Sequence, residues 1–160
     1  MFLGLCYAPS MNTKPHVLLI DDETEILEIL DLMLTRAGFK VTLAESGEQA
    51  LNALTDTNFD MVVCDYLMPK MNGIELLRII RGHKDYTPFI FFSGNADDSH
   101  RVEVIGLGAY DIVPKTEIMN LVEILNKRMK QDAKLASIDG ASAETEESDD
   151  FLKLLYSTEN

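Results

Sequence analysis

The 160-residue sequence has no tryptophan, only two cysteines and only three histidines, and these shortages exclude several kinds of protein. Cys6 and Cys64 are too few for a disulfide framework, and neither they nor the histidines have the spacing of a metal-binding motif. Cys64 lies within an apolar run, where an inert core thiol is expected. We therefore expect His16, His83 and His100 to be structural or solvated rather than catalytic.

The chain also lacks a long hydrophobic run and an excess of basic residues. Residues 1–10 are apolar but too short to span a membrane, and they have no basic start typical of a secretory signal. We expect residues 1–13 to be a disordered extension, or the natural start to be Met11, in a cytoplasmic protein.

The net charge is −13: residues 1–131 hold 19 acidic and 12 basic residues, and residues 132–160 hold 8 acidic and 2 basic residues. This acidic balance without a basic stripe argues against nucleic acid as a direct ligand.

Short apolar runs alternate with helical patterns along the chain. The expected strands are 16–20, 39–44, 60–64, 88–92 and 110–113, and the expected helices are 24–37, 47–54, 73–81, 98–107 and 117–130. Such alternation predicts a doubly wound α/β fold of the (βα)5 type, with a flavodoxin-like parallel sheet of order 2-1-3-4-5 covered on both faces. The folded domain should span 14–131. We expect residues 132–148 to be an acidic, flexible linker and residues 149–160 a short amphipathic tail, either frayed or used for docking.

Two helix starts can be predicted from capping residues. Ser46 with Gln49, and Asn72 with Glu75, have the spacing of a capping box. The second box begins a helix soon after Asp65, which follows a buried strand. Asp65 should therefore lie in a loop at the C-terminal mouth of that strand, where open α/β sheets bind ligands.

Reactive side chains follow four of the expected strands. Asp21 and Asp22 come after the first, Asp65 after the third, Ser93 after the fourth and Lys115 after the fifth. Parallel strands end at one edge of the sheet, so these side chains should converge. Three carboxylates repel one another unless a cation joins them, and oxygen ligands with open positions suit Mg²⁺. A lysine and a hydroxyl could hold transferred phosphoryl oxygens, and a carboxylate can act as the nucleophile that forms an aspartyl phosphate.

The motifs around these residues resemble the receiver domain of two-component response regulators, of the single-domain chemotaxis-regulator kind. The resemblance covers about residues 14–131 and rests on Ile20-Asp21-Asp22-Glu23, on the run from Cys64 to Gly73, on Phe92-Ser93-Gly94, and on Gly108-Ala109 leading to Lys115. It implies that Asp65 is the phospho-acceptor, supplied by a histidine kinase, and that the partner is a histidine kinase or, in a phosphorelay, a histidine phosphotransferase. It also implies that Asp22, Asp65 and the backbone carbonyl of Leu67 hold Mg²⁺, while Asp21 acts mainly through water. Ser93 would be the switch hydroxyl, and Lys115 would pair with the phosphate.

Two positions depart from the family pattern. Ile112 stands where the family usually has an aromatic residue, and Tyr110, two residues earlier, is expected on the same side of the strand. The family's Lys-Pro is replaced by Lys115-Thr116, for which we expect a trans peptide and an N-cap role for Thr116. The phosphoryl chemistry is therefore expected to be intact, whereas the readout through Tyr110 and Ile112 should differ.

Two classes of function remain at this stage. The first is a stand-alone switch without an attached output domain, which signals to a downstream protein through the face of the fourth helix, fifth strand and last helix; this face also allows a homodimer. Its variants are a phosphorelay intermediate and a binding module independent of phosphorylation. The second is a phosphatase with an aspartyl-phosphate intermediate, which would want Asp-x-Asp where this chain has Asp21-Asp22-Glu23. We favour the switch, acting on itself rather than as an enzyme on a foreign substrate.

Overall fold

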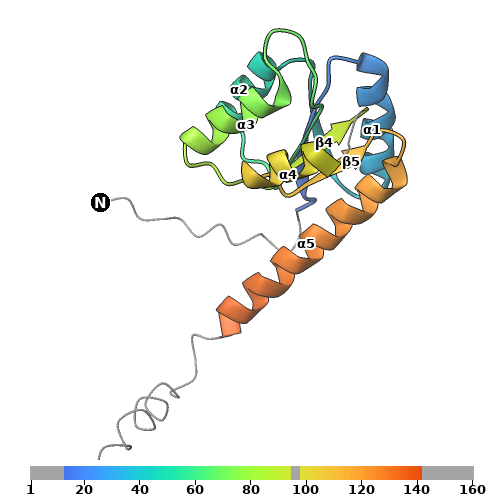
Figure 1. The fold of residues 1–160 in the computed structure, drawn as a ribbon. Helices are drawn as coiled ribbons and strands as arrows, with labels where there is room; N and C mark the ends of the chain where they lie inside the picture. Colours follow the sequence, from blue (N-terminus) through green and yellow to red (C-terminus); the bar gives the residue numbers. More distant parts are fainter. Residues whose placement is uncertain (1–12, 95–97, 142–160) are drawn as a thin grey trace, which may run out of the picture.

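The computed structural model describes residues 13–94 and 98–141, and over these residues it has the predicted architecture (Figure 1). Five parallel strands form one sheet in the order β2-β1-β3-β4-β5. The strands are β1 (His16–Ile20), β2 (Lys40–Ala44), β3 (Met61–Cys64), β4 (Phe89–Ser93) and β5 (Asp111–Pro114). The helices are α1 (Thr24–Arg36), α2 (Gly47–Asp56), α3 (Gly73–Gly82), α4 (Asp98–Gly106) and α5 (Ile118–Ala141).

The helices cover both faces of the sheet, so the molecule has three layers and two cores (Figure 1). One core contains the apolar sides of α1 and α5, and the other contains those of α2, α3 and α4. Successive residues of β1 alternate between them: Val17 and Leu19 face α1 and α5, whereas Leu18 and Ile20 face the opposite side. Because both faces of a central parallel strand are buried, its sequence is continuously apolar rather than alternating.

The strand register determines which residues meet at the C-terminal edge. Ile20 pairs with Cys64, Cys64 with Phe91, and Phe91 with Ile112. Ile20 and Cys64 are the last residues of β1 and β3, so Asp21 and Asp65 leave the sheet side by side. The backbone N–H of Asp65, for example, donates to the carbonyl oxygen of Ile20 at 2.8 Å.

The cap predicted for α3 is confirmed, and the cap predicted for α2 is only half formed. The Asn72 side chain accepts from the Glu75 N–H at 2.9 Å, and the Glu75 carboxylate accepts from the Asn72 N–H at 2.9 Å. At α2, Ser46 accepts from the Gln49 N–H, but the Gln49 side chain accepts from the N–H of residue 45 instead of from that of Ser46. The reciprocal capping box is therefore complete only at α3, the helix that follows Asp65.

The last helix differs from its prediction at both ends. It begins at Ile118, and Thr116 lies in a turn closed by a 2.8 Å bond from the Glu117 N–H to the Pro114 carbonyl, so Thr116 is not the N-cap. It ends at Ala141 rather than at residue 130, which corrects the expected linker over 132–141. Lysine, leucine and alanine in this stretch have high helix propensity, which favours a helix even where no core is buried. The rest of the expected linker and tail, 142–160, and the extension 1–12 lie outside the described residues.

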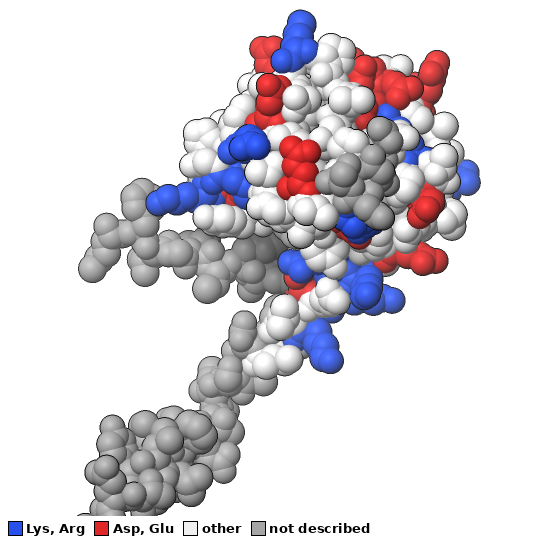
Figure 2. All heavy atoms as spheres, viewed as in Figure 1, with Lys and Arg blue, Asp and Glu red and all other residues white. Residues whose placement is uncertain are grey.

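The second half of α5 projects from the domain and carries a strip of basic side chains (Figures 1 and 2). Lys127, Lys130 and Lys134 are exposed and lie three and four residues apart, on one side of the helix. This local strip was not expected from the acidic composition. Within the described ranges, no helix is both long and apolar enough to span a membrane.

Candidate functional site

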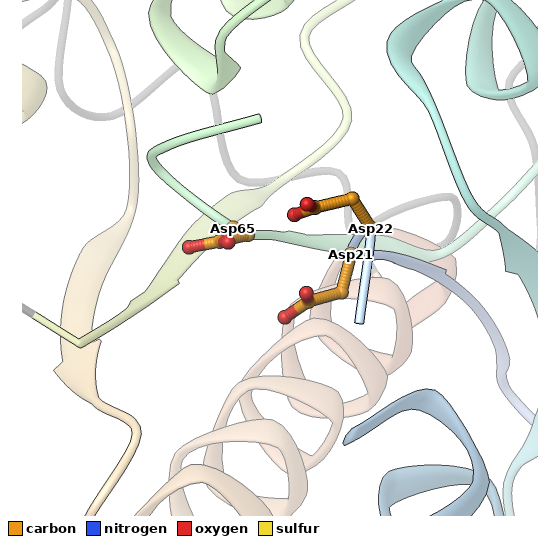
Figure 3. A group of neighbouring side chains, drawn as sticks. All are labelled: Asp21, Asp22 and Asp65. Atoms are coloured by element: carbon orange, nitrogen blue, oxygen red, sulfur yellow. The ribbon is translucent and has the colours of Figure 1, made fainter. Parts of the chain in front are cut away.

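Three carboxylates meet at the C-terminal edge of the sheet (Figure 3). One ligand oxygen from each of Asp21, Asp22 and Asp65 lies within 4.8 Å of the others. Asp21 and Asp65 are buried, with 2% and 6% of their surface exposed, whereas Asp22 is exposed. The convergence predicted from the strand ends is therefore present in the structure.

Lys115 reaches into this cluster from the end of β5. Its ammonium group lies 2.7 Å from the Asp21 carboxylate and 3.2 Å from the Asp65 carboxylate. It also contacts the Glu23 carboxylate at 2.8 Å, a contact that the sequence did not suggest. The trans backbone around Lys115 and Thr116 is as predicted, since no cis peptide bond occurs among the described residues, and it still directs the lysine toward Asp65.

Burial raises the pKa of the two buried carboxylates, Asp21 and Asp65. Burial, followed by the neighbouring Asp21 charge, raises the pKa of Asp65, and Lys115 offsets only part of this increase. Burial likewise raises the pKa of Asp21 against the hydrogen bond from Lys115. Burial alone would lower the pKa of Lys115, but its bonds to Asp21 and Glu23 raise it above its ordinary value. The site thus holds a fixed ammonium beside carboxylates that would gain from further positive charge.

The raised pKa of Asp65 predicts that the charged site reduces the stability of the fold. A carboxyl group whose folded pKa exceeds its ordinary value of 3.8 stabilises the fold below pH 3.8, and this contribution is lost as the pH rises through the folded pKa. Asp65→Asn should therefore raise the melting temperature at neutral pH in metal-free buffer. The difference from wild type should shrink as the pH falls toward 3.8. Thermal melts across this pH range test the prediction, and a lower melting temperature for the variant at pH 7 would contradict it.

The donor set at this edge fits a hard divalent cation. Asp21, Asp22 and Asp65 offer only carboxylate oxygens, and their mutual repulsion is relieved by a positive ion. The Leu67 side chain is 66% exposed, while the Leu67 backbone N–H donates to the Asp65 carboxylate. This places the Leu67 main chain beside the cluster. The acidic group can therefore bind a metal ion.

Ser93 is the last residue of β4 and lies at the same edge. It is 2% exposed and pairs with Pro114 of β5, and its carbonyl oxygen accepts from the Lys115 N–H at 2.8 Å. The backbone of Ser93 thus fixes the point at which Lys115 leaves the sheet. Among the predicted site residues, Lys115 contacts Asp21 and Asp65, and Asp22 lies within 4.8 Å of these two carboxylates. Ser93 lies on the strand end beside them.

The expectation that Tyr110 and Ile112 share one side of the strand is wrong. Ile112 is 1% exposed in the core that contains α4, whereas Tyr110 packs in the core that contains α5, with Arg128 over its ring at 5.2 Å. The physical reason is that β5 begins only at Asp111, so the alternation of a regular strand does not extend back to Tyr110. The two side chains therefore face different helices.

One aromatic contact near the site was missed by sequence reasoning. Tyr66, the residue after Asp65, donates its hydroxyl to the Glu103 carboxylate at 3.0 Å and packs edge-on against the His100 ring at 5.0 Å. Both partners belong to α4. The sequence shows only an aromatic next to Asp65, and its partners are 34 and 37 positions away, so no local pattern could identify the link.

The fold and site define a doubly wound α/β protein with an acidic, lysine-bearing pocket at the C-terminal edge of its sheet. The chain belongs to the response regulator receiver domain family, whose family model matches residues 17–127. Among curated relatives, it is 37% identical over 105 residues to the transcriptional regulatory protein FixJ of Bradyrhizobium diazoefficiens, covering 66% of this chain and 51% of that one. It is 39% identical over 99 residues to the transcriptional regulatory protein CpxR of Escherichia coli, covering 62% and 42%. The chain thus spans about half the length of the curated relatives it matches.

Solved receiver structures agree with this assignment. The receiver domain of Francisella response regulator 1452 superposes with a TM-score of 0.71 at 30% identity, covering 74% of this chain and 99% of that one. The chemotaxis response regulator CheY4 of Vibrio cholerae superposes with a TM-score of 0.68 at 27% identity, covering 72% and 99%. The match therefore includes nearly all of each solved domain.

Proposed function

We propose that the chain is a phospho-accepting receiver in which Asp65 takes a phosphoryl group from a histidine kinase or a histidine phosphotransferase. The observation that carries the proposal is the position of Lys115, whose ammonium lies between the Asp21 and Asp65 carboxylates. A cation held there can neutralise phosphoryl oxygens without having to be recruited from solvent. Relatives that are transcriptional regulators, and solved receiver domains, support the same role.

Mg²⁺ is the metal that this donor set suits best, because it accepts carboxylate oxygens and keeps positions for water and phosphate. Asp22, Asp65 and the Leu67 carbonyl would hold it, with Asp21 acting mainly through water. When bound, the ion would neutralise charge on the phosphoryl oxygens.

The reaction uses the side chains in distinct roles. A carboxylate oxygen of Asp65 attacks the phosphorus of a phosphohistidine donor, a P–O bond forms, and the P–N bond breaks with its electron pair going to the imidazole nitrogen. Lys115 contacts a phosphoryl oxygen, and Ser93, at the end of β4, donates its hydroxyl to another. Attack of water on phosphorus later breaks the P–O bond to Asp65 and releases inorganic phosphate. The domain thus changes its own state rather than turning over a foreign substrate.

The signal would leave through protein contact. The surface formed by α4, β5 and α5 lies next to Ser93. Beneath it, Ile112 packs in one core and Tyr110 packs in the other. Arg101 of α4 ties this surface together, since it pairs with the Asp111 carboxylate and donates to the Ile112 carbonyl at 3.0 Å. A downstream protein, or a second copy of the chain, would bind this surface.

The proposal is tested by incubating the full-length protein with acetyl phosphate and Mg²⁺ and measuring its intact mass. We expect a gain of one phosphoryl group, and beryllofluoride with Mg²⁺ should shift amide resonances of residues 63–68 and 93–94 in an NMR spectrum. No change with either reagent would overturn the phospho-acceptor role and favour a binding module independent of phosphorylation.

A further inference from the structure

Glu23 contacts the reactive lysine, although it is outside the residues assigned to the phosphoryl chemistry. Its carboxylate accepts from the Lys115 ammonium at 2.8 Å. The same ammonium lies 2.7 Å from Asp21 and 3.2 Å from Asp65. An ammonium has three donors, and three carboxylates lie within 3.2 Å of this one. Lys115 is therefore closer to Asp21 and Glu23 than to the proposed phospho-acceptor.

Glu23 directly precedes α1, but its side chain does not cap the helix. Glu23 is the N-cap residue of α1, and its side chain makes no cap hydrogen bond. Its carboxylate instead accepts from Lys115, the residue after β5, 92 positions along the chain. A side chain that bonds the first turn typically stabilises a helix by about 1 kcal/mol, and α1 forgoes that contribution here.

We propose that Glu23 is a positioning residue that holds Lys115 in its resting place and releases it when a phosphoryl group arrives on Asp65. This inference rests on the proposed phospho-acceptor function. Glu23 and the phosphoryl oxygens compete for the same ammonium. Glu23 thereby sets the equilibrium between the resting and the phosphorylated arrangement of the site.

Burial decides which carboxylate gives up the lysine. The Asp21 side chain is 3% exposed, so losing Lys115 would leave a buried carboxylate without its cation. The Glu23 side chain is 57% exposed and can be hydrated again at small cost. Glu23 should therefore release Lys115 first. Weakening this contact destabilises only the resting arrangement. The equilibrium therefore shifts toward the phosphorylated arrangement by the same free energy.

The test compares three variants of the full-length protein with wild type. Glu23→Gln removes the charge, Glu23→Asp keeps the charge but shortens the reach, and Glu25→Gln removes a charge from the same exposed turn of α1. Beryllofluoride affinity is measured by NMR titration at saturating Mg²⁺, after the Mg²⁺ affinity of each variant has been determined. Exposed ion pairs contribute up to about 1 kcal/mol, so Glu23→Gln should bind beryllofluoride about two- to fivefold more tightly. Phosphate release from Asp65 should slow in parallel.

The conservative variant separates the contact from simple charge. If Glu23 acts by contact, Glu23→Asp should behave like Glu23→Gln, and Glu25→Gln should remain close to wild type. Equal effects of Glu23→Gln and Glu25→Gln, or wild-type affinity in both Glu23 variants, would overturn the inference. In metal-free buffer, Glu23→Gln should also change the free energy of unfolding when it is introduced into wild type. The same substitution should leave that free energy unchanged when it is introduced into Lys115→Gln. If wild type does not bind beryllofluoride at all, the phospho-acceptor role is overturned instead. Failure of the proposed function can therefore be distinguished from failure of the inference about Glu23.

Discussion

The Asp65→Asn variant is expected to gain no phosphoryl group from acetyl phosphate and Mg²⁺, whereas wild type gains one. An amide oxygen is a poor nucleophile and cannot form an acyl phosphate, so labelling should fall to background. The surroundings of residue 65 should change little, because its N–H still donates to the Ile20 carbonyl and its side chain can still accept from Lys115. Intact mass measured over time, with both proteins at equal concentration, gives the result directly.

A matched substitution shows whether the loss is specific. Asp56→Asn makes the same chemical change on an exposed residue at the end of α2, and it should be phosphorylated like wild type. Because Asp65→Asn is also expected to be more stable at neutral pH, unfolding cannot account for its lost labelling. Labelling of Asp65→Asn at the wild-type rate would place the acceptor on another side chain.

Much of this site could be read from the sequence because strand order and register are governed by simple rules. Continuous apolar runs identify parallel strands buried on both faces, and their C-terminal ends share an edge. Once Asp21 and Asp65 each follow such a run, their neighbourhood depends only on β1 and β3 pairing. The observed pairing of Ile20 with Cys64 places them one residue beyond the same row.

The errors arose where a local rule was extended beyond the element that supports it. Strand alternation predicts the side of Tyr110 only if the strand includes it, but Tyr110 precedes β5 and packs against Arg128 of α5. The core-facing pattern predicts that the last helix ends at residue 130, whereas the helix continues to Ala141 through residues that include good helix formers. The residue type of Thr116 favours an N-cap, but Thr116 lies in a turn and the helix begins later, at Ile118.

Contacts between distant segments were beyond the reach of sequence reasoning. Glu23 follows the two predicted metal ligands directly, yet nothing in that run indicates that it contacts Lys115. The bond from Tyr66 to Glu103 is similar, since it depends on how closely α4 packs against the loop after β3. Both contacts tie the edge of the site to a helix, α1 in one case and α4 in the other, and both concern how the site is held rather than which atoms react.

Gly73→Ala is expected to destabilise the domain and to displace Asp65. Gly73 begins α3, and a Cβ atom there would lie 2.4 Å from the Asp65 carbonyl oxygen and 2.7 Å from the Phe91 ring. Neither neighbour can move easily, because the Asp65 backbone is bonded to β1 and Phe91 is fully buried. Overpacking of this kind costs roughly 3 kcal/mol, which lowers the melting temperature by on the order of 10 °C. Acyl phosphate labelling should slow as well, since the nucleophile is moved.

Gly82→Ala provides the matched comparison at the other end of the same helix. A Cβ at Gly82 has nothing within 4 Å, so alanine should be neutral or stabilising by about 0.5 kcal/mol through its effect on the unfolded chain. Melting curves and labelling rates of the two variants separate helix propensity from close packing against Asp65. If both variants melt like wild type, the loop after β3 can relax around a methyl group. The close approach of Gly73 would then not be what holds the proposed phospho-acceptor in place.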